Sequence, residues 1–221
     1  MTAPIDIERA RFNMIEQQIR PWDVLDLDVL ALLSHVKRED FVPPAYKALA
    51  FVDTEVPLPH GQFMLAPKVE ARLLQELDVR KHERVLEVGA GSGHMAALLG
   101  HRAQQVTTLE TIPELVEMAR ANLQSAGLMN VSVRQADGSR GLPDEAPFDV
   151  ILLSGSVAEV PPALLSQLKA GGRLAAVVGQ QPIMRATLFT RSGEHGFSSV
   201  ALFDTVAPRL SGFDEPPRFK F

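Results

Sequence analysis

The stretch that decides the fold reads Val85-Leu86-Glu87-Val88-Gly89-Ala90-Gly91-Ser92-Gly93. A short apolar run leads into three alternate glycines, and a helical pattern follows from Gly93 to about Gly100. Glycine has no Cβ, so its backbone takes positive φ angles and approaches a ligand closely, while the following helix offers N–H groups to an anion. We interpret the stretch as a strand, a cofactor-binding turn (Gly89, Ala90, Gly91, Ser92 and Gly93) and a helix.

The order of strand and helix repeats on both sides of this turn. Helical patterns occupy residues 67–77 and 113–126, and short apolar runs occupy residues 84–88, 105–109, 131–134, 148–153 and 172–178. Such alternation predicts a parallel sheet covered on both faces. The runs at 186–190 and 198–205 are separated only by a turn-rich segment, 191–197, which predicts a hairpin. We therefore expect an α/β fold with a doubly wound, mostly parallel seven-stranded Rossmann-like sheet, an antiparallel edge and an N-terminal helical cap.

The first 62 residues differ from the rest. Apolar side chains recur at helical spacing at Phe12, Ile15 and Ile19, and again from Val29 to Val36, which predicts two helices. Prolines interrupt the chain after the second of these helices, and residues 51–62 have the pattern of an extended connection. We predict a helical cap and connection at residues 1–62, packed onto the main domain at residues 63–221 to form one compact unit.

Composition narrows the class of protein. The chain has 221 residues, 46% of them hydrophobic and 22% charged, without an apolar run long enough to span a membrane. A net charge of −5 argues against nucleic acid as a partner. The sequence has no cysteine, and residues 1–11 lack a secretory signal pattern, so we expect a cytoplasmic protein. The histidines, His94 among them, have no metal-ligand spacing; we expect surface or loop positions and no metal.

Carboxylates beside the glycine turn indicate which cofactor it binds. A dinucleotide turn is spaced Gly-x-Gly-x-x-Gly, and here the third glycine comes one residue early, which disfavours NAD. Glu87 can pair with a ligand ammonium, such as that of S-adenosylmethionine. Glu110, with Thr111 beside it, ends the next strand and can bind ribose hydroxyls. Asp137, followed by Gly138, can accept from an adenine amino group. A tight turn with a solvated Glu87, and an Asp-Gly turn without a ligand, are the alternatives.

Taken together these motifs resemble one family. The glycine stretch, Glu110, Asp137-Gly138, Ala146-Pro147-Phe148-Asp149, and Gly61-Gln62 with Ala66-Pro67 are similar to the protein-L-isoaspartate O-methyltransferase family, over roughly residues 12–208. The resemblance implies a doubly wound sheet with helical additions at its front, and a methyltransferase domain at residues 63–221. It further implies S-adenosylmethionine as cofactor, and as partner a protein or peptide whose L-isoaspartyl carboxylate is methylated to begin repair.

The acceptor side departs from the family pattern. After Gly-Gln the family has Thr-Ile-Ser, whose hydroxyl meets the acceptor carboxylate, whereas this chain has Phe63-Met64-Leu65. Leu65 cannot donate a hydrogen bond. Losing one hydrogen bond to a charged group costs about 1.5–3 kcal/mol, or roughly one to two powers of ten in rate. A hydroxyl of Ser154 or Ser156 is a candidate replacement, with hydrogen bonding inside the loop as the alternative.

Three other functions stay open at this point. The apolar residues 63–65 suit a related methyltransferase with a different acceptor. A second alternative is a non-catalytic module that binds the cofactor or a protein, and a third is a dinucleotide-dependent oxidoreductase. The sequence does not fix the oligomeric state.

Overall fold

The computed structural model describes residues 6–193 and 196–215. Residues 1–5, on which part of the signal-sequence expectation rested, and residues 194–195 of the expected 191–197 turn lie outside the described residues, as do residues 216–221.

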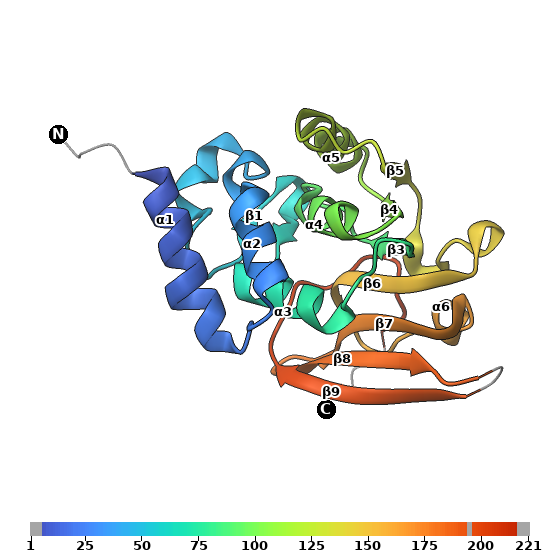
Figure 1. Cartoon of the computed structure of the whole chain (residues 1–221). Helices are drawn as coiled ribbons and strands as arrows, with labels where there is room; N and C mark the ends of the chain where they lie inside the picture. Colours follow the sequence, from blue (N-terminus) through green and yellow to red (C-terminus); the bar gives the residue numbers. More distant parts are fainter. Residues whose placement is uncertain (1–5, 194–195, 216–221) are drawn as a thin grey trace, which may run out of the picture.

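A seven-stranded sheet forms the centre of the molecule (Figure 1). Its strand order is β5-β4-β3-β6-β7-β8-β9, in which the first five strands run parallel and β8 and β9 continue as antiparallel neighbours. The predicted mostly parallel sheet with an antiparallel edge is thus confirmed. The strands are β3 (Arg84–Val88), β4 (Gln105–Glu110), β5 (Val131–Gln135), β6 (Phe148–Val157), β7 (Leu168–Gln180), β8 (Ile183–Arg191) and β9 (Phe197–Asp204).

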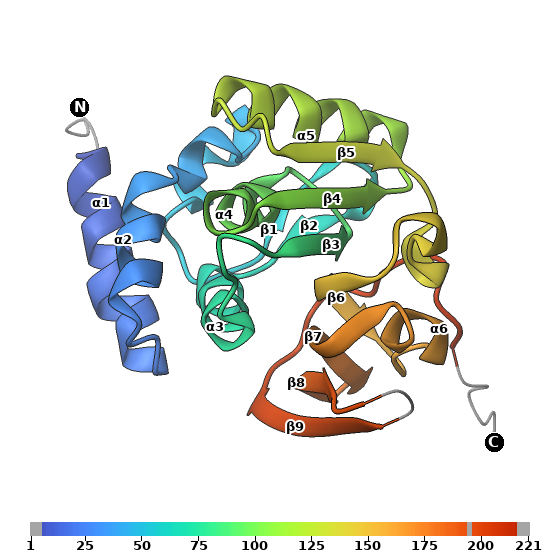
Figure 2. The same cartoon turned by 45° about the vertical axis from the view of Figure 1, so that its right-hand side comes forward.

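Helices cover both faces of the sheet because successive strand residues point to opposite sides (Figure 2). In β6, Val150 and Leu152 pack in the core beneath the larger helices, whereas Ile151 and Leu153 pack in a second core with Leu164 of the short helix on the other face. Three of these helices begin with proline, a residue suited to the first helical turn. The helices are α3 (Pro67–Leu77), α4 (His94–Arg102), α5 (Pro113–Ser125) and α6 (Pro162–Leu165).

The N-terminal cap contains the two predicted helices, α1 (Ile7–Met14), which continues as a π-helical turn over Ile15–Ile19, and α2 (Leu27–His35). Phe12 lies in α1 as predicted, but its side chain is 63% exposed. Arg11 takes the inward position instead and is paired there with Glu39. None of the helices within the described residues has the length and apolar character needed to cross a membrane.

The connection between cap and domain is less extended than expected. It includes β1 (Val56–Pro57), which pairs antiparallel with β2 (Phe63–Met64), so the boundary predicted between residues 62 and 63 falls inside this pairing. Buried cap residues such as Met14 belong to the same core cluster as Val85 of the sheet. The division into two parts stays a prediction.

The sheet topology places a crevice beside β3. From β3 the chain runs outward to β4 and β5, then returns to β6 on the opposite side of β3. Ligands of open α/β sheets bind at such a reversal, outside the carboxyl ends of the strands. The glycine turn after β3 and Ser154 near the end of β6 therefore lie where a cofactor site is expected.

Candidate active site

A cleft at this reversal brings together segments that are distant in the sequence. The predicted residues that line it are Gly89, Gly91, Glu110, Thr111, Gly138 and Ser154. The predicted cofactor-binding set did not include the other lining residues, which are Gln62, Phe63, Val88, Leu109, Leu115, Ala136, Leu210 and Ser211. Gln62 was noted as typical of one family and Phe63 as part of the altered acceptor segment, whereas Leu210 and Ser211, which follow β9, had no sequence signal.

The glycine turn depends on backbone conformations that favour glycine. Gly89, Gly91 and Gly93 have φ angles of 94°, 52° and 86°. A Cβ on Gly89 would lie 2.8 Å from the Leu210 side chain, so this position is also tightly packed.

Four amides of this turn are hydrogen-bonded within the protein. The amides of Gly89 and Ala90 donate to the Leu109 carbonyl, that of Gly93 donates to the Ala90 carbonyl, and that of Gly91 donates to Glu110 Oε2 at 3.0 Å. These four amides are therefore not available to a ligand, and the turn contributes to the cleft through its backbone conformation.

Glu110 is fixed by the backbone around it. Its Oε1 accepts from the amides of Thr111 at 2.8 Å and Ile112 at 3.1 Å, in addition to the Gly91 amide on Oε2. The side chain is 8% exposed and borders the cleft. A carboxylate has about four acceptor sites, so Glu110 retains capacity for a ligand hydroxyl while already held in place.

Glu87 is a fully buried carboxyl group behind the cleft wall. The Ser154 hydroxyl donates to its Oε1 at 2.6 Å, while Oε2 has no hydrogen-bond partner in the part of the chain that the structure describes. Burial raises the pKa of Glu87 to about 7, although the hydroxyls of Ser154 and Thr108 oppose the shift. An orphaned acceptor in this position fits a cationic group on a ligand, such as an ammonium or sulfonium, better than an anionic one.

Asp137 and Gly138 have separate roles in this structure. Asp137 is exposed, and its side chain accepts from the Ser139 amide at 2.9 Å, which caps the short 3₁₀ turn Gly138–Arg140. Gly138 borders the cleft, and a Cβ there would lie 2.4 Å from Val88. The close approach of the backbone to β3 thus requires glycine, whereas the contact between Asp137 and adenine stays a prediction.

A smaller cavity of about 30 Å³ lies between β2 and the glycine turn, next to the cleft. Leu65 and Ser154 both border it, as do Ala90 and Ser92, so the structure brings the candidate acceptor residues 65 and 154 together. Ser156 is different. It is fully buried, and its hydroxyl donates to the Ala207 carbonyl at 2.8 Å, so it secures the segment after β9 instead of facing an acceptor.

Glu70 and His94 also border this small cavity, and sequence reasoning missed both. His94 is only 2% exposed, so the expectation of a surface or loop position is wrong. Glu70 carried a usable signal, because it interrupts the buried residues Val69 and Ala71 of an amphipathic helix. A charge in that position indicates a buried partner.

A glycine turn at the reversal of a doubly wound sheet, followed by a fixed acidic residue at the end of the next strand, defines the class of Rossmann-like S-adenosylmethionine-dependent methyltransferases. Residues 9–205 match the family described as protein-L-isoaspartate(D-aspartate) O-methyltransferase. The chain belongs to this family.

Individual relatives agree with that assignment. The chain is 43% identical over 185 residues to the protein-L-isoaspartate O-methyltransferase of Koribacter versatilis, covering 84% of this chain and 82% of the relative. A solved protein-L-isoaspartate O-methyltransferase has the same fold with a TM-score of 0.77 at 24% identity, over 93% of this chain and 66% of that one. A solved putative member from Plasmodium falciparum, in complex with S-adenosyl-L-homocysteine, also gives a TM-score of 0.77, at 21% identity, over 91% and 98% of the two chains.

Proposed function

We propose that this protein transfers a methyl group from S-adenosylmethionine to the side-chain carboxylate of L-isoaspartyl residues in damaged proteins. The observation that carries the proposal is the cleft in which the glycine turn, Glu110 and Gly138 converge at the reversal of the sheet. Membership of the family and the names of the relatives support the choice of reaction and of a protein substrate. The absence of cysteine suits the reducing cytoplasm, which we propose as the compartment.

The residues present fit this cofactor. Glu110 would accept from the ribose hydroxyls, the backbone at Gly138 would lie against the adenine, and Glu87 with Ser154 would face the cationic methionine part. When bound, S-adenosylmethionine supplies a methyl group activated by its positive sulfur. The orphaned Oε2 of Glu87 is the feature that specifically favours a cation.

The chain's own residues position the acceptor and exclude water. A carboxylate with a reference pKa of roughly 4 is ionised near neutral pH and needs no general base. What it needs is a short, aligned approach in a site with little water. Met64 and Leu65 are buried apolar walls of the small cavity that adjoins Gly89, and they provide such surroundings.

A methyl-transfer assay tests the proposal. Radiolabelled S-adenosylmethionine is incubated with an isoaspartyl peptide and with the same peptide carrying ordinary aspartate, and we expect a base-labile methyl ester on the first only. Calorimetry of S-adenosylhomocysteine binding runs in parallel. Cofactor binding without transfer to the isoaspartyl peptide would refute the proposal and favour a methyltransferase with another acceptor or a non-catalytic binding module.

A further inference from the structure

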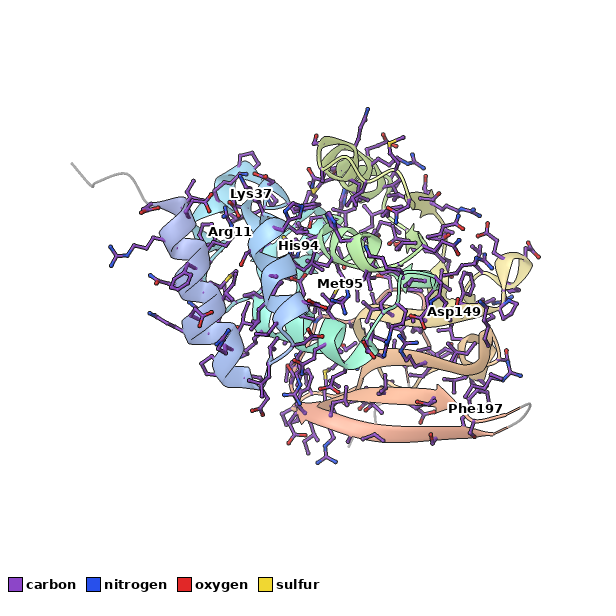
Figure 3. The ribbon with its side chains drawn as sticks, in the orientation of Figure 1. Arg11, Lys37, His94, Met95, Asp149 and Phe197 are labelled. Atoms are coloured by element: carbon purple, nitrogen blue, oxygen red, sulfur yellow. The ribbon has the colours of Figure 1, made fainter. Side chains whose placement is uncertain are left out.

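Three buried polar side chains meet beside the small cavity. Arg38, Glu70 and His94 are 1%, 3% and 2% exposed and come from the 3₁₀ turn Arg38–Asp40, from α3 and from the start of α4. Arg38 Nη1 donates to Glu70 Oε2, and His94 Nδ1 lies 2.9 Å from the same oxygen. Figure 3 labels His94 where the cap helices meet α4. We call these three residues the buried cluster.

The hydrogen bonds of the buried cluster define the state of the imidazole. Burial favours a neutral Glu70, but Arg38 and His94 outweigh it and lower the pKa of this carboxyl, so Glu70 is ionised. Arg38 Nη1 also lies 3.3 Å from Nδ1, but an ionised carboxylate only accepts hydrogen bonds, so we assign the hydrogen of Nδ1 to the shorter, 2.9 Å contact with Glu70. Nδ1 of His94 is therefore the donor to Glu70, and Nε2 is the ring atom left for another partner.

Nε2 of His94 has no hydrogen-bond partner among residues 6–193 and 196–215. It is buried without a hydrogen bond, and so is Nε of Arg38. Leaving a buried polar atom unpaired costs about 1–3 kcal/mol, so such atoms usually indicate a ligand or a water. Phe41 packs against the imidazole with ring centroids 5.3 Å apart, and His94 is one of the residues that line the cavity shared with Leu65 and Ser154.

The charges around the imidazole suit one bound anion. Arg38 and Glu70 neutralise each other, and Glu39, which follows Arg38, is already paired with Arg11. Glu87 on β3 is the other carboxyl near Glu70. A protonated His94 would leave the buried cluster with one positive charge, which a single carboxylate in the cavity would balance.

We propose that His94 binds the acceptor carboxylate through its Nε2–H and so takes the place of the hydroxyl that Leu65 lacks. This inference rests on the proposed function. A water needs roughly 10–15 Å³ of such space, so the cavity of about 30 Å³ has room for the two oxygens of a carboxylate. Arg38 supports the same wall from behind, since its Nη2 donates to the Leu65 carbonyl at 2.8 Å.

Binding of the acceptor is then linked to a proton. With Nδ1–H held by Glu70, a neutral imidazole has only a lone pair at Nε2 and repels a carboxylate. The acceptor therefore binds to the protonated ring, and the complex takes up a proton at His94 whenever the free protein holds the ring neutral.

Two substitutions distinguish the hydrogen-bond donor of His94 from the bulk of its side chain. His94→Gln keeps an N–H₂ group near the position of Nε2, whereas His94→Leu removes the donor. With S-adenosylhomocysteine bound, we expect His94→Leu to weaken calorimetric binding of the isoaspartyl peptide about ten- to a hundredfold and to raise the KM of methyl transfer similarly. We expect His94→Gln to retain most of the affinity, and Leu65→Ser to restore much of it to His94→Leu. Affinity for S-adenosylhomocysteine should stay constant throughout.

A measurement on the unsubstituted protein avoids any folding defect of the variants. Peptide binding is measured by calorimetry in two buffers that differ in ionisation enthalpy, across pH 6–9, and proton uptake that is absent in His94→Gln is expected. If the wild type methylates the isoaspartyl peptide but His94→Leu binds it equally well, or no proton is taken up at any pH, the role of His94 is wrong and the proposed function stands. If the wild type neither binds nor methylates the peptide, both fail.

Discussion

Replacing Arg38 should lower the free energy of unfolding more than almost any substitution at the surface. Arg38→Met deletes a guanidinium that is 1% exposed and leaves the ionised Glu70, 3% exposed, with His94 alone for compensation. It also strips the Leu65 carbonyl of its donor. Breaking a buried ion pair by removing one partner costs about 3–5 kcal/mol, because the remaining charge is desolvated without a counter-charge.

The loss is measured by urea unfolding followed by circular dichroism, with the slope against urea compared to confirm the same unfolding transition. For a chain of this size, 3–5 kcal/mol corresponds to a melting temperature lower by roughly 6–20 °C. Arg20→Met is the matched control, since its ion pair with Glu16 is 45% exposed on the arginine side and is worth at most about 1 kcal/mol. The triple change Arg38→Met, Glu70→Leu and His94→Phe should recover most of the loss. A decrease below about 1 kcal/mol for Arg38→Met would refute a desolvated Glu70 carboxylate.

Three further expectations concern the carboxyl groups of the cleft. The pKa of Glu87 is raised from 4.5 to about 7, so its contribution to stability is complete below pH 4.5 and is lost as the pH rises through 7. Glu87→Gln should therefore be more stable than the wild type at pH 8, by up to about 3 kcal/mol. Equal urea midpoints at pH 5 and pH 8 for both proteins would contradict this. Ser154→Ala removes the donor that favours the ionised form and should raise the pKa of Glu87 further, as followed by carbon NMR of its carboxyl group; an unmoved titration would show that the hydrogen bond has no influence. Glu110→Ala should weaken S-adenosylmethionine binding at least about tenfold by calorimetry, and unchanged affinity would remove Glu110 from the ribose site.

The strand, turn and helix around Gly89 were predictable because their signals are local. A short apolar run and closely spaced glycines dictate backbone conformation within a few positions. The donors of the turn were not predictable in the same way. Parallel pairing of Val88 with Leu109 carries the end of β4 alongside the turn, so the Leu109 carbonyl and Glu110 take amides that a local pattern leaves free.

The buried cluster escaped prediction because its members are ordinary charged or polar residues when taken one at a time. Arg38 and His94 are 56 positions apart, and only the packing of the cap against α3 and α4 desolvates them. Ser156 was misjudged for a related reason. Its partner carbonyl at Ala207 is 51 positions away, in a segment without a sequence pattern of its own.

The segment after β9 has a consequence for synthesis of the enzyme. Ser156 holds Ala207, and Leu210 packs against Gly89 to close one wall of the cofactor cleft. During translation the glycine turn leaves the ribosome long before Leu210 does. A nascent chain can therefore pair its central strands early, yet its nucleoside pocket is incomplete until this late-emerging segment has docked. Proteins truncated before residue 207 should therefore lack a functional nucleoside pocket.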